Sequence, residues 1–126
     1  MGQNVMIGNS GFPNEPSIMM DPKNPNRLVA GANINQFYYS NDTGRTWKSG
    51  LLKSSFGVWG DPVIDVDTMG NFYFFHLSNP FQGSWIDRIV CQKSEDGGKT
   101  WSRIRTPHGD HHGHWINPDN SLNMIN

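Results

Sequence analysis

The octets SNDTGRTW at residues 40–47 and SEDGGKTW at residues 94–101 are nearly the same sequence within one chain of 126 residues. Ser, Asp, Gly, Thr and Trp recur in the same register, and the octets differ only at spacer positions or by Arg for Lys. A repeat at this spacing indicates that one structural unit occurs more than once along the chain. The octets therefore decide how the rest of the sequence is interpreted.

Each fixed position of the octet has its own physical role in a tight turn. The carboxylates of Asp42 and Asp96 are expected to accept hydrogen bonds from backbone N–H groups of the same loop. Gly44 and Gly98 suit positions with positive φ, because no Cβ obstructs that region. The remaining positions are expected to add hydroxyl hydrogen bonds and to anchor an indole in the hydrophobic layer beneath the turn. They are Ser40, Thr46 and Trp47 in the first octet, and Ser94, Thr100 and Trp101 in the second.

The composition favours an all-β fold. The chain has 14 Gly and 8 Pro, which supply turns, and only 35% hydrophobic residues, of which aromatic side chains make a large part at 12% of the chain. Aromatic residues are enriched in strands and bury a large area each. No window free of Pro and Gly shows a sustained helical period.

Before each octet the same order of elements recurs: a short strand, a turn and two further strands. This order predicts two complete four-stranded antiparallel sheets and a third unit that begins near His114. The first two units differ in length because loop-forming residues are inserted at 78–84. All units belong to one domain over residues 1–126. The expected boundaries are about 14–55 for the first unit, about 58–106 for the second and about 108–126 for the partial third.

Charge and hydropathy exclude several classes of partner. The net charge is −1 and neither sign forms a run, so the sequence predicts no nucleic acid and no membrane surface as a partner. No apolar stretch approaches the roughly 20 residues of a membrane helix, and the first residues lack the pattern of a signal peptide. The sequence is therefore expected to be soluble, with no compartment assigned. Cys91 lies in an alternating run and is expected to be a small buried side chain.

A dense histidine cluster lies near the end of the sequence. Four imidazoles and one carboxylate within seven residues could hold a divalent zinc, copper or nickel ion, and this is the only cofactor that the sequence suggests. Neighbouring side chains in a strand point to opposite faces, however, so the same residues could instead be surface or channel-lining histidines. The candidate ligands are His108, Asp110, His111, His112 and His114.

The two octets resemble the Asp box, or bacterial neuraminidase repeat, which occurs at a hairpin of β-propeller blades in sialidases and many other propellers. From about Asn14 to Trp101 the chain is similar to sialidase-like repeat proteins, in stretches such as NEPSIMMDPKNPNRLVAGAN and WGDPVIDVDTMGNFYFFHLSNP. The tail GDHHGHWINPDNSLNMI resembles the start of a blade in sortilin-type Asp-box propellers. The resemblance implies that each four-stranded unit is a propeller blade, and similar proteins are often secreted.

Two functions are compatible with that resemblance. The favoured one is a non-catalytic Asp-box repeat module that binds a carbohydrate or a protein, with Trp59 and Trp85 as candidates for stacking on a sugar. The other is a sialidase-like glycoside hydrolase that is active only as a complete ring. The resemblance implies that a sialidase grips the substrate carboxylate with three arginines, and no convincing set of three is evident in the sequence.

The number of blades has a consequence for assembly. Propellers typically contain four to eight blades, so two blades and part of a third cannot close a ring. We expect either a homo-oligomer, a dimer or a trimer, or the remainder of a larger propeller to complete it. Residues 1–10 are a candidate closing strand between chains, through Asn4 to Ile7.

Overall fold

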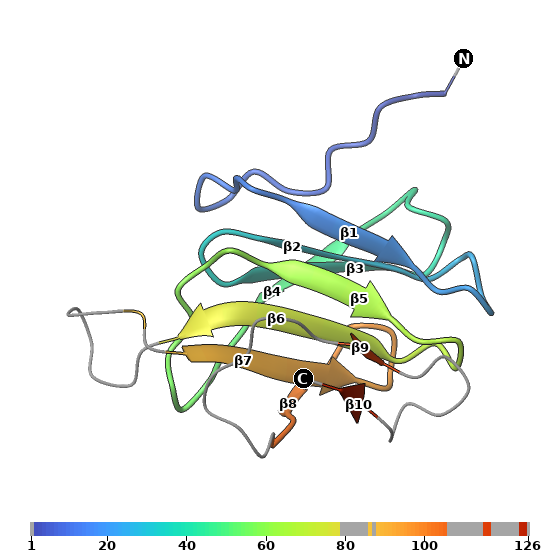
Figure 1. Cartoon of the computed structure of the whole chain (residues 1–126). Coiled ribbons are helices and arrows are strands. Elements are labelled where there is room, and N and C mark those ends of the chain that lie inside the picture. Colours follow the sequence, from blue (N-terminus) through green and yellow to red (C-terminus); the bar gives the residue numbers. More distant parts are fainter. Residues whose placement is uncertain (1, 79–85, 87, 106–114, 117–123, 126) are drawn as a thin grey trace.

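The computed structural model describes residues 2–78, 86, 88–105, 115–116 and 124–125 (Figure 1). The described part is all-β, as expected, and contains two four-stranded antiparallel sheets. No helix long and apolar enough to cross a membrane is present among these residues. Trp85 and the predicted metal ligands between 108 and 114 lie outside the described residues.

The first sheet is a meander in which strands adjacent in sequence are adjacent in space. It contains β1 (Ser17–Met20), β2 (Leu28–Ala32), β3 (Gln36–Ser40) and β4 (Lys48–Leu51), in the order β1-β2-β3-β4. The first octet forms the turn between β3 and β4. Hence the repeated sequence closes the sheet at its last hairpin.

The second sheet repeats this arrangement. It contains β5 (Val63–Val66), β6 (Phe72–Ser78), β7 (Arg88–Ser94) and β8 (Ser102–Arg103), again in sequence order, with the second octet between β7 and β8. The remaining strands, β9 (Trp115–Ile116) and β10 (Met124–Ile125), form a two-stranded antiparallel pair. The sequence places this pair in the expected third unit.

The two sheets also share one register. Met20, Leu28 and Ser40 lie in one row across β1, β2 and β3. Val66, Phe72 and Ser94 form the corresponding row across β5, β6 and β7. Because the octet serines occupy the same place in both rows, the paired residues of the first three strands of one sheet can be matched to those of the other.

A buried aspartate shapes the first hairpin of each sheet. Asp21 Oδ1 accepts hydrogen bonds from the backbone N–H groups of Lys23 (2.8 Å) and Asn24 (3.2 Å). Asp67 Oδ1 accepts them from Met69 and Asn71, both at 2.9 Å. An Asp side chain that bonds the backbone in this way mimics a turn and fixes its geometry.

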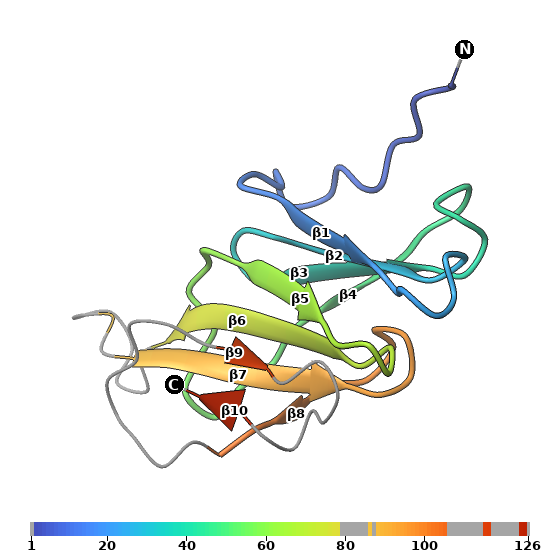
Figure 2. The ribbon, with the colours of Figure 1, turned by 45° about the vertical axis from the view of Figure 1, so that its right-hand side comes forward.

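The two sheets pack face to face, and the main hydrophobic core lies between them. Val29 and Leu52 from the first unit pack with Ile64, Phe72 and Phe74 from the second, and all five are almost completely buried. β5 lies beside β1 and β2, as both views show (Figures 1 and 2). The backbone N–H of Ile64 donates to Ser17 Oγ at 2.9 Å, so a hydrogen bond also joins the sheets.

The connection between the sheets, residues 52–62, is tied to both of them. Its first residue, Leu52, donates its backbone N–H to Asn35 O (2.7 Å) in the first sheet's β2–β3 turn. Trp59 donates its backbone N–H to Leu77 O (2.8 Å) on β6 of the second sheet. At the edge of the second sheet, the guanidinium groups of two arginines lie 4.6 and 4.5 Å from the ring centre of Phe56. These arginines are Arg88 and Arg103.

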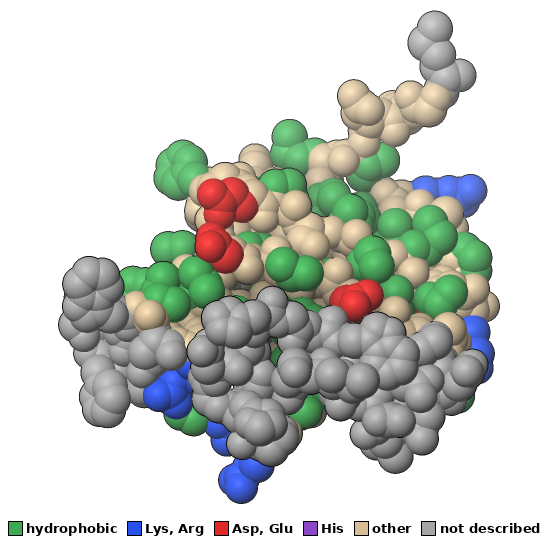
Figure 3. Space-filling view, viewed as in Figure 1, with side chains coloured by type: hydrophobic (Ala, Val, Ile, Leu, Met, Phe, Trp, Pro, Cys, Tyr) green, Lys and Arg blue, Asp and Glu red, His purple; other side chains and the backbone are tan. Residues whose placement is uncertain are grey.

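The other face of the first sheet, here called the outer face, carries Ile18, Met20, Ala30 and Tyr38, with the indole of Trp47 packed beside them. Residues 2–9 form no strand in the isolated chain; Ile7 instead packs against this face, over Ala30, Ala32 and Tyr38. Figure 3 shows hydrophobic side chains gathered along the side of the molecule that carries β1 and β5. Ile18 and Met20 on the outer face are about half exposed, so this face is only partly covered.

Candidate functional site

The first octet folds into a turn around the carboxylate of Asp42. Asp42 Oδ1 accepts hydrogen bonds from the Thr46 backbone N–H and from Ser40 Oγ, both at 2.8 Å. Thr46 Oγ1 donates to Asp42 Oδ2 at 2.5 Å. Ser40 Oγ in turn accepts from the Gly44 N–H at 2.9 Å. The expected contacts between carboxylate and backbone are present.

The second octet repeats these four hydrogen bonds and adds one from the Lys99 backbone N–H. Asp96 Oδ1 accepts from the backbone N–H groups of Thr100 (2.9 Å) and Lys99 (3.0 Å) and from Ser94 Oγ (2.8 Å). Thr100 Oγ1 donates to Asp96 Oδ2 at 2.5 Å, and Ser94 Oγ accepts from the Gly98 N–H at 2.9 Å. The residues that the two octets share thus form the same four hydrogen bonds in two different surroundings.

The glycines of both turns have the positive φ expected of them, 78° at Gly44 and 87° at Gly98. A residue with a side chain would be strained at these angles. Their surroundings differ, because a Cβ at Gly98 would lie 2.6 Å from Val29 Cγ2 in the first sheet. The three nearest heavy atoms to a Cβ at Gly44 all belong to Trp47 of the same turn.

The hydrogen bonds hold both turn carboxylates ionised. The Thr46 side chain, then its backbone N–H, then Ser40 lower the pKa of Asp42 from 3.8 to about 2. Burial pushes the pKa of Asp96 upward, but hydrogen bonds from Thr100 outweigh it, and the net pKa is lowered. A general acid needs a pKa near the working pH. These carboxylates therefore suit a structural role and do not suit proton transfer.

The two octet tryptophans lie in different environments. Trp101 lies between the sheets, where its ring packs edge-to-face on Phe74 (5.6 Å between ring centroids) and Phe37 (6.0 Å). Its Nε1 is buried and has no hydrogen-bond partner among the described residues. Trp47 instead lies at the outer face of the first sheet and donates its Nε1–H to Gly44 O at 2.9 Å. Only one of the two indoles anchors its turn to a second sheet.

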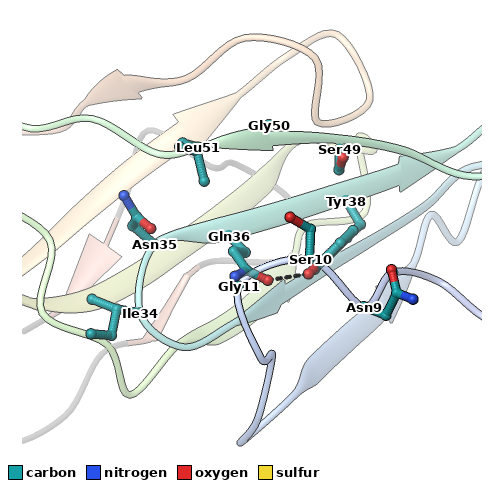
Figure 4. A pocket seen from close by; sticks show the side chains of 11 residues that line it. Asn9, Ser10, Gly11, Ile34, Asn35, Gln36, Tyr38, Ser49, Gly50 and Leu51 are labelled. Atoms are coloured by element: carbon teal, nitrogen blue, oxygen red, sulfur yellow. Dashed lines mark hydrogen bonds between the residues drawn. The ribbon is translucent and has the colours of Figure 1, made fainter.

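A pocket of about 720 Å³ lies between residues 8–11 and the strands β3 and β4 (Figure 4). Its lining includes Gln36, Tyr38, Ser49 and Leu51, and the Tyr38 hydroxyl donates to Gln36 Oε1. No acidic, basic or histidine side chain is among the described residues that line it. The pocket therefore offers neutral hydrogen-bonding groups and apolar surface, which suit an uncharged ligand.

Sequence reasoning did not find this pocket. Trp59, the described one of the two predicted sugar-stacking residues, is 41% exposed in the connection and does not line it. The pocket forms because residues 8–11 return over the first sheet, where Gly8 lies close to the Tyr38 ring and Gly11 close to the Gln36 side chain. Because its lining comes from segments that are separate in the sequence, no short sequence motif predicts this pocket.

The described arginine contacts fall at opposite ends of the sheets. Arg27 Nη1 lies 4.0 Å from Asp21 Oδ2 at the turn end of the first sheet, and Arg45 belongs to the first octet turn at the same end. Arg88 begins β7 at the opposite end of the second sheet, where it contacts Phe56 together with Arg103. Among these four arginines, whose contacts or place in the turns are described, no three share one site.

His76 is a buried polar residue that the sequence analysis did not single out. Its side chain is 1% exposed on β6. Nδ1 lies 3.0 Å from Leu77 O and 2.9 Å from Ser78 Oγ, and Nε2 lies 3.1 Å from Gln92 Nε2. A neutral ring with its proton on Nδ1 satisfies these contacts, because Nε2 then accepts from Gln92. Burial lowers the pKa of His76.

Among the described residues, no group of three or more His, Cys, Asp or Glu side chains is placed to hold a metal ion. Asp67, an acidic residue at the β5–β6 turn, is fully used as a hydrogen-bond acceptor, since Tyr73 Oη and Asn71 Nδ2 donate to its Oδ2 at 3.0 and 2.8 Å. Cys91 is buried as expected, and burial raises the pKa of its thiol to about 12. A reactive cysteine needs a lowered pKa, so this thiol is a packing group.

Comparison with known proteins gives no family to which the chain can be assigned. No protein-family model matches the sequence, and no curated protein or solved structure matches it at a significant level.

Proposed function

We propose that the chain is a non-catalytic Asp-box β-propeller module that supplies successive blades of a ring and acts by binding a protein or a carbohydrate. One observation carries this proposal: two meander sheets of equal order and register, each closed by the same carboxylate-centred turn, stack face to face with β5 beside β1 and β2. Successive blades of a propeller are related in this way.

The chemistry of the described residues supports a binding role. The turn carboxylates accept several hydrogen bonds each, Arg27 lies at the opposite end of the sheets from Arg88 and Arg103, and the pocket beneath residues 8–11 has a neutral lining. Neutral hydrogen-bonding groups around a partly apolar floor suit the hydroxyls and ring faces of an uncharged glycan. Completion of the ring, by further copies as a dimer or trimer or by the rest of a larger propeller, belongs to the same proposal.

The enzymatic alternative can be tested directly with fluorogenic sialosides and a panel of glycan substrates. We expect no turnover at any protein concentration. Turnover that purifies with the protein would overturn the non-catalytic proposal and restore the sialidase-like alternative.

The carbohydrate part of the proposal is tested on an immobilised glycan array with two matched variants. Ser49 and Ser55 are both exposed, but only Ser49 lines the pocket. A glycan held in the pocket should be lost in Ser49→Trp, which fills it, and retained in Ser55→Trp. If no glycan binds the wild-type protein, carbohydrate drops out of the proposal and a protein ligand remains.

A further inference from the structure

The outer face of the first sheet is the repeat equivalent of a face that is buried in the second sheet. In the common register, Ile18 and Met20 on β1 correspond to Ile64 and Val66 on β5. Ile64 belongs to the core between the sheets, and Val66 packs against that core. The outer face of the first sheet is therefore the counterpart of the face with which the second sheet packs on the first. Among the described residues, no further sheet lies on the outer face.

Exposure distinguishes the two equivalent faces. Ile18 and Met20 are each 48% exposed, whereas Ile64 is 4% exposed. On the neighbouring strand β2, Ala30 and Ala32 are already buried beneath Ile7 and Trp47, whereas Leu28 beside Met20 is partly exposed. The free apolar patch is therefore formed by Ile18, Met20 and Leu28, and exposed apolar patches are typical of surfaces that contact another protein.

The two octet turns also differ in whether they contact a preceding sheet. Gly98 and Trp101 in the second turn rest on Val29 and Phe37 of the preceding sheet. In the first turn, the equivalent Gly44 has only Trp47 of its own turn as its nearest neighbour. The side of the turn that contacts a preceding sheet at Gly98 therefore has no such close contact at Gly44 among the described residues.

The closest contact between the stacked sheets involves their first strands, since β5 lies against β1 and β2. By equivalence, β1 is the strand that would approach a preceding sheet most closely. Residues 7–11 cover the β3 side of the outer face through Ile7 on Tyr38, and they leave Ile18 and Met20 on β1 half exposed. The β1 side of the outer face, which would contact a preceding sheet most closely, is therefore the side that residues 7–11 leave exposed.

We propose that the outer face, centred on Ile18 and Met20, is the docking surface for a second copy of this chain. The copy docks head to tail and presents the end of its stack that carries β9 and β10. In Figures 1 and 2 this pair lies on the side of the second sheet away from the first, so the two ends of the stack are different surfaces. This inference rests on the proposed function, because it assumes that the stacking of the two sheets continues between copies.

A second copy suits this surface because two copies could then pack on each other in the same way as the two sheets pack within one chain. The existing interface between the two sheets provides the template: an apolar first strand beside the preceding sheet, and a turn glycine and indole against it. A contact between two different surfaces of the same chain closes into a ring when the rotation permits, and each added copy buries one exposed outer face.

The test compares two identical chemical changes. Met20→Glu places a charge in the proposed interface, whereas Met69→Glu makes the same change at a 58% exposed position in the β5–β6 turn, away from the outer face. Mass is measured by light scattering and sedimentation over a range of concentrations. We expect the wild-type protein and Met69→Glu to form the same dimer or trimer, and Met20→Glu to associate at least about tenfold more weakly, because a buried unpaired charge is costly.

Near-UV circular dichroism and urea unfolding of Met20→Glu show whether the fold is retained. If Met20 disrupts the fold, Ile18→Lys is the second variant at the same surface. A wild-type protein that stays monomeric at every concentration would overturn the proposal, and so would a Met20→Glu protein that assembles like wild type or a Met69→Glu protein that fails to assemble. These experiments measure assembly, whereas the proposed function is tested by sialoside turnover and glycan binding. Failure of one proposal can therefore be distinguished from failure of the other.

A mixing experiment tests the head-to-tail geometry. Fluorescently labelled Met20→Glu protein keeps an intact β9–β10 end, so it should still bind to the free outer face of wild-type copies and terminate their assembly. If the variant fails to join wild-type protein, the contact is between two outer faces and the head-to-tail arrangement is wrong.

Discussion

At the scale of single residues, the ionised Asp42 is the centre of its turn. The unfolded carboxyl protonates near pH 3.8, and the folded one protonates at about 2. The stability that Asp42 contributes is therefore fully present above pH 3.8 and is lost as the pH falls toward 2. An NMR titration of the Asp42 carboxyl carbon should give a midpoint near 2.

The same titration in two threonine variants identifies the source of the shift. Thr46→Val removes the side-chain hydrogen bond that lowers the pKa of Asp42 most, so the midpoint should rise toward 3.8. Thr43→Val is the matched control, because the hydroxyl that it removes donates to Asn26 Oδ1. A wild-type midpoint already at 3.8 would show that the turn does not hold the carboxylate.

The free energy of unfolding should also depend on pH through His76, because the folded protein favours the neutral form of this side chain. Its folded pKa is lowered below the unfolded value of 6.5, so the unfolded state binds the proton more readily. The free energy of unfolding should therefore fall as the pH drops from 7 through 6.5 to 5. Urea unfolding at pH 7 and pH 5 measures this fall, and the variant His76→Gln should show less of it. Equal pH dependence in the two proteins would contradict a buried neutral imidazole.

At the scale of the turn, Gly44 and Gly98 form a natural matched pair. Alanine at either position is strained by a positive φ, at a cost of about 1–2 kcal/mol. At Gly98 the new methyl group also meets Val29 Cγ2 at 2.6 Å, and crowding of this kind costs about 1–3 kcal/mol more. Gly98→Ala should therefore lower the urea midpoint more than Gly44→Ala, and equal losses would show that the second turn does not contact the first sheet.

The sequence predicted the hairpins better than it predicted which faces of the strands are covered. The fixed spacing of Ser, Asp, Gly and Thr determines a turn locally, because all the bonding partners lie within eight residues. By contrast, β6 reads FYFFHLS, an almost continuous apolar run with no alternation to distinguish its two faces. The burial of His76 and the different places of Trp47 and Trp101 depend on contacts between sheets, which local pattern does not contain.

At the scale of the whole molecule, the stacking of the two sheets can be measured through one aromatic pair. Phe37 and Trp101 come from different sheets and pack edge-to-face at 6.0 Å. A double-mutant cycle with Phe37→Leu and Trp101→Leu should give a coupling of about 0.5–1.5 kcal/mol in urea unfolding. A coupling of zero would show that the sheets are not packed in solution.

The number of sheets was predictable because it follows from counting turns and strands, and the all-β class followed from composition. The third unit is described only as the backbone of β9 and β10, and the histidine cluster lies outside the described residues. The pocket and the covering of the outer face by Ile7 were not predictable, since residues 2–11 carry no pattern that determines where they fold back.

The connection at residues 52–62 determines how the molecule responds to proteases. Hydrogen bonds from Leu52 to Asn35 and from Trp59 to Leu77, together with the arginine contacts of Phe56, hold it against both sheets along its length. Proteolytic enzymes need several residues of detached, extended chain in their clefts. Limited digestion should therefore leave the two sheets joined as one resistant fragment, and cleavage within the connection should begin only when the domain unfolds as a unit.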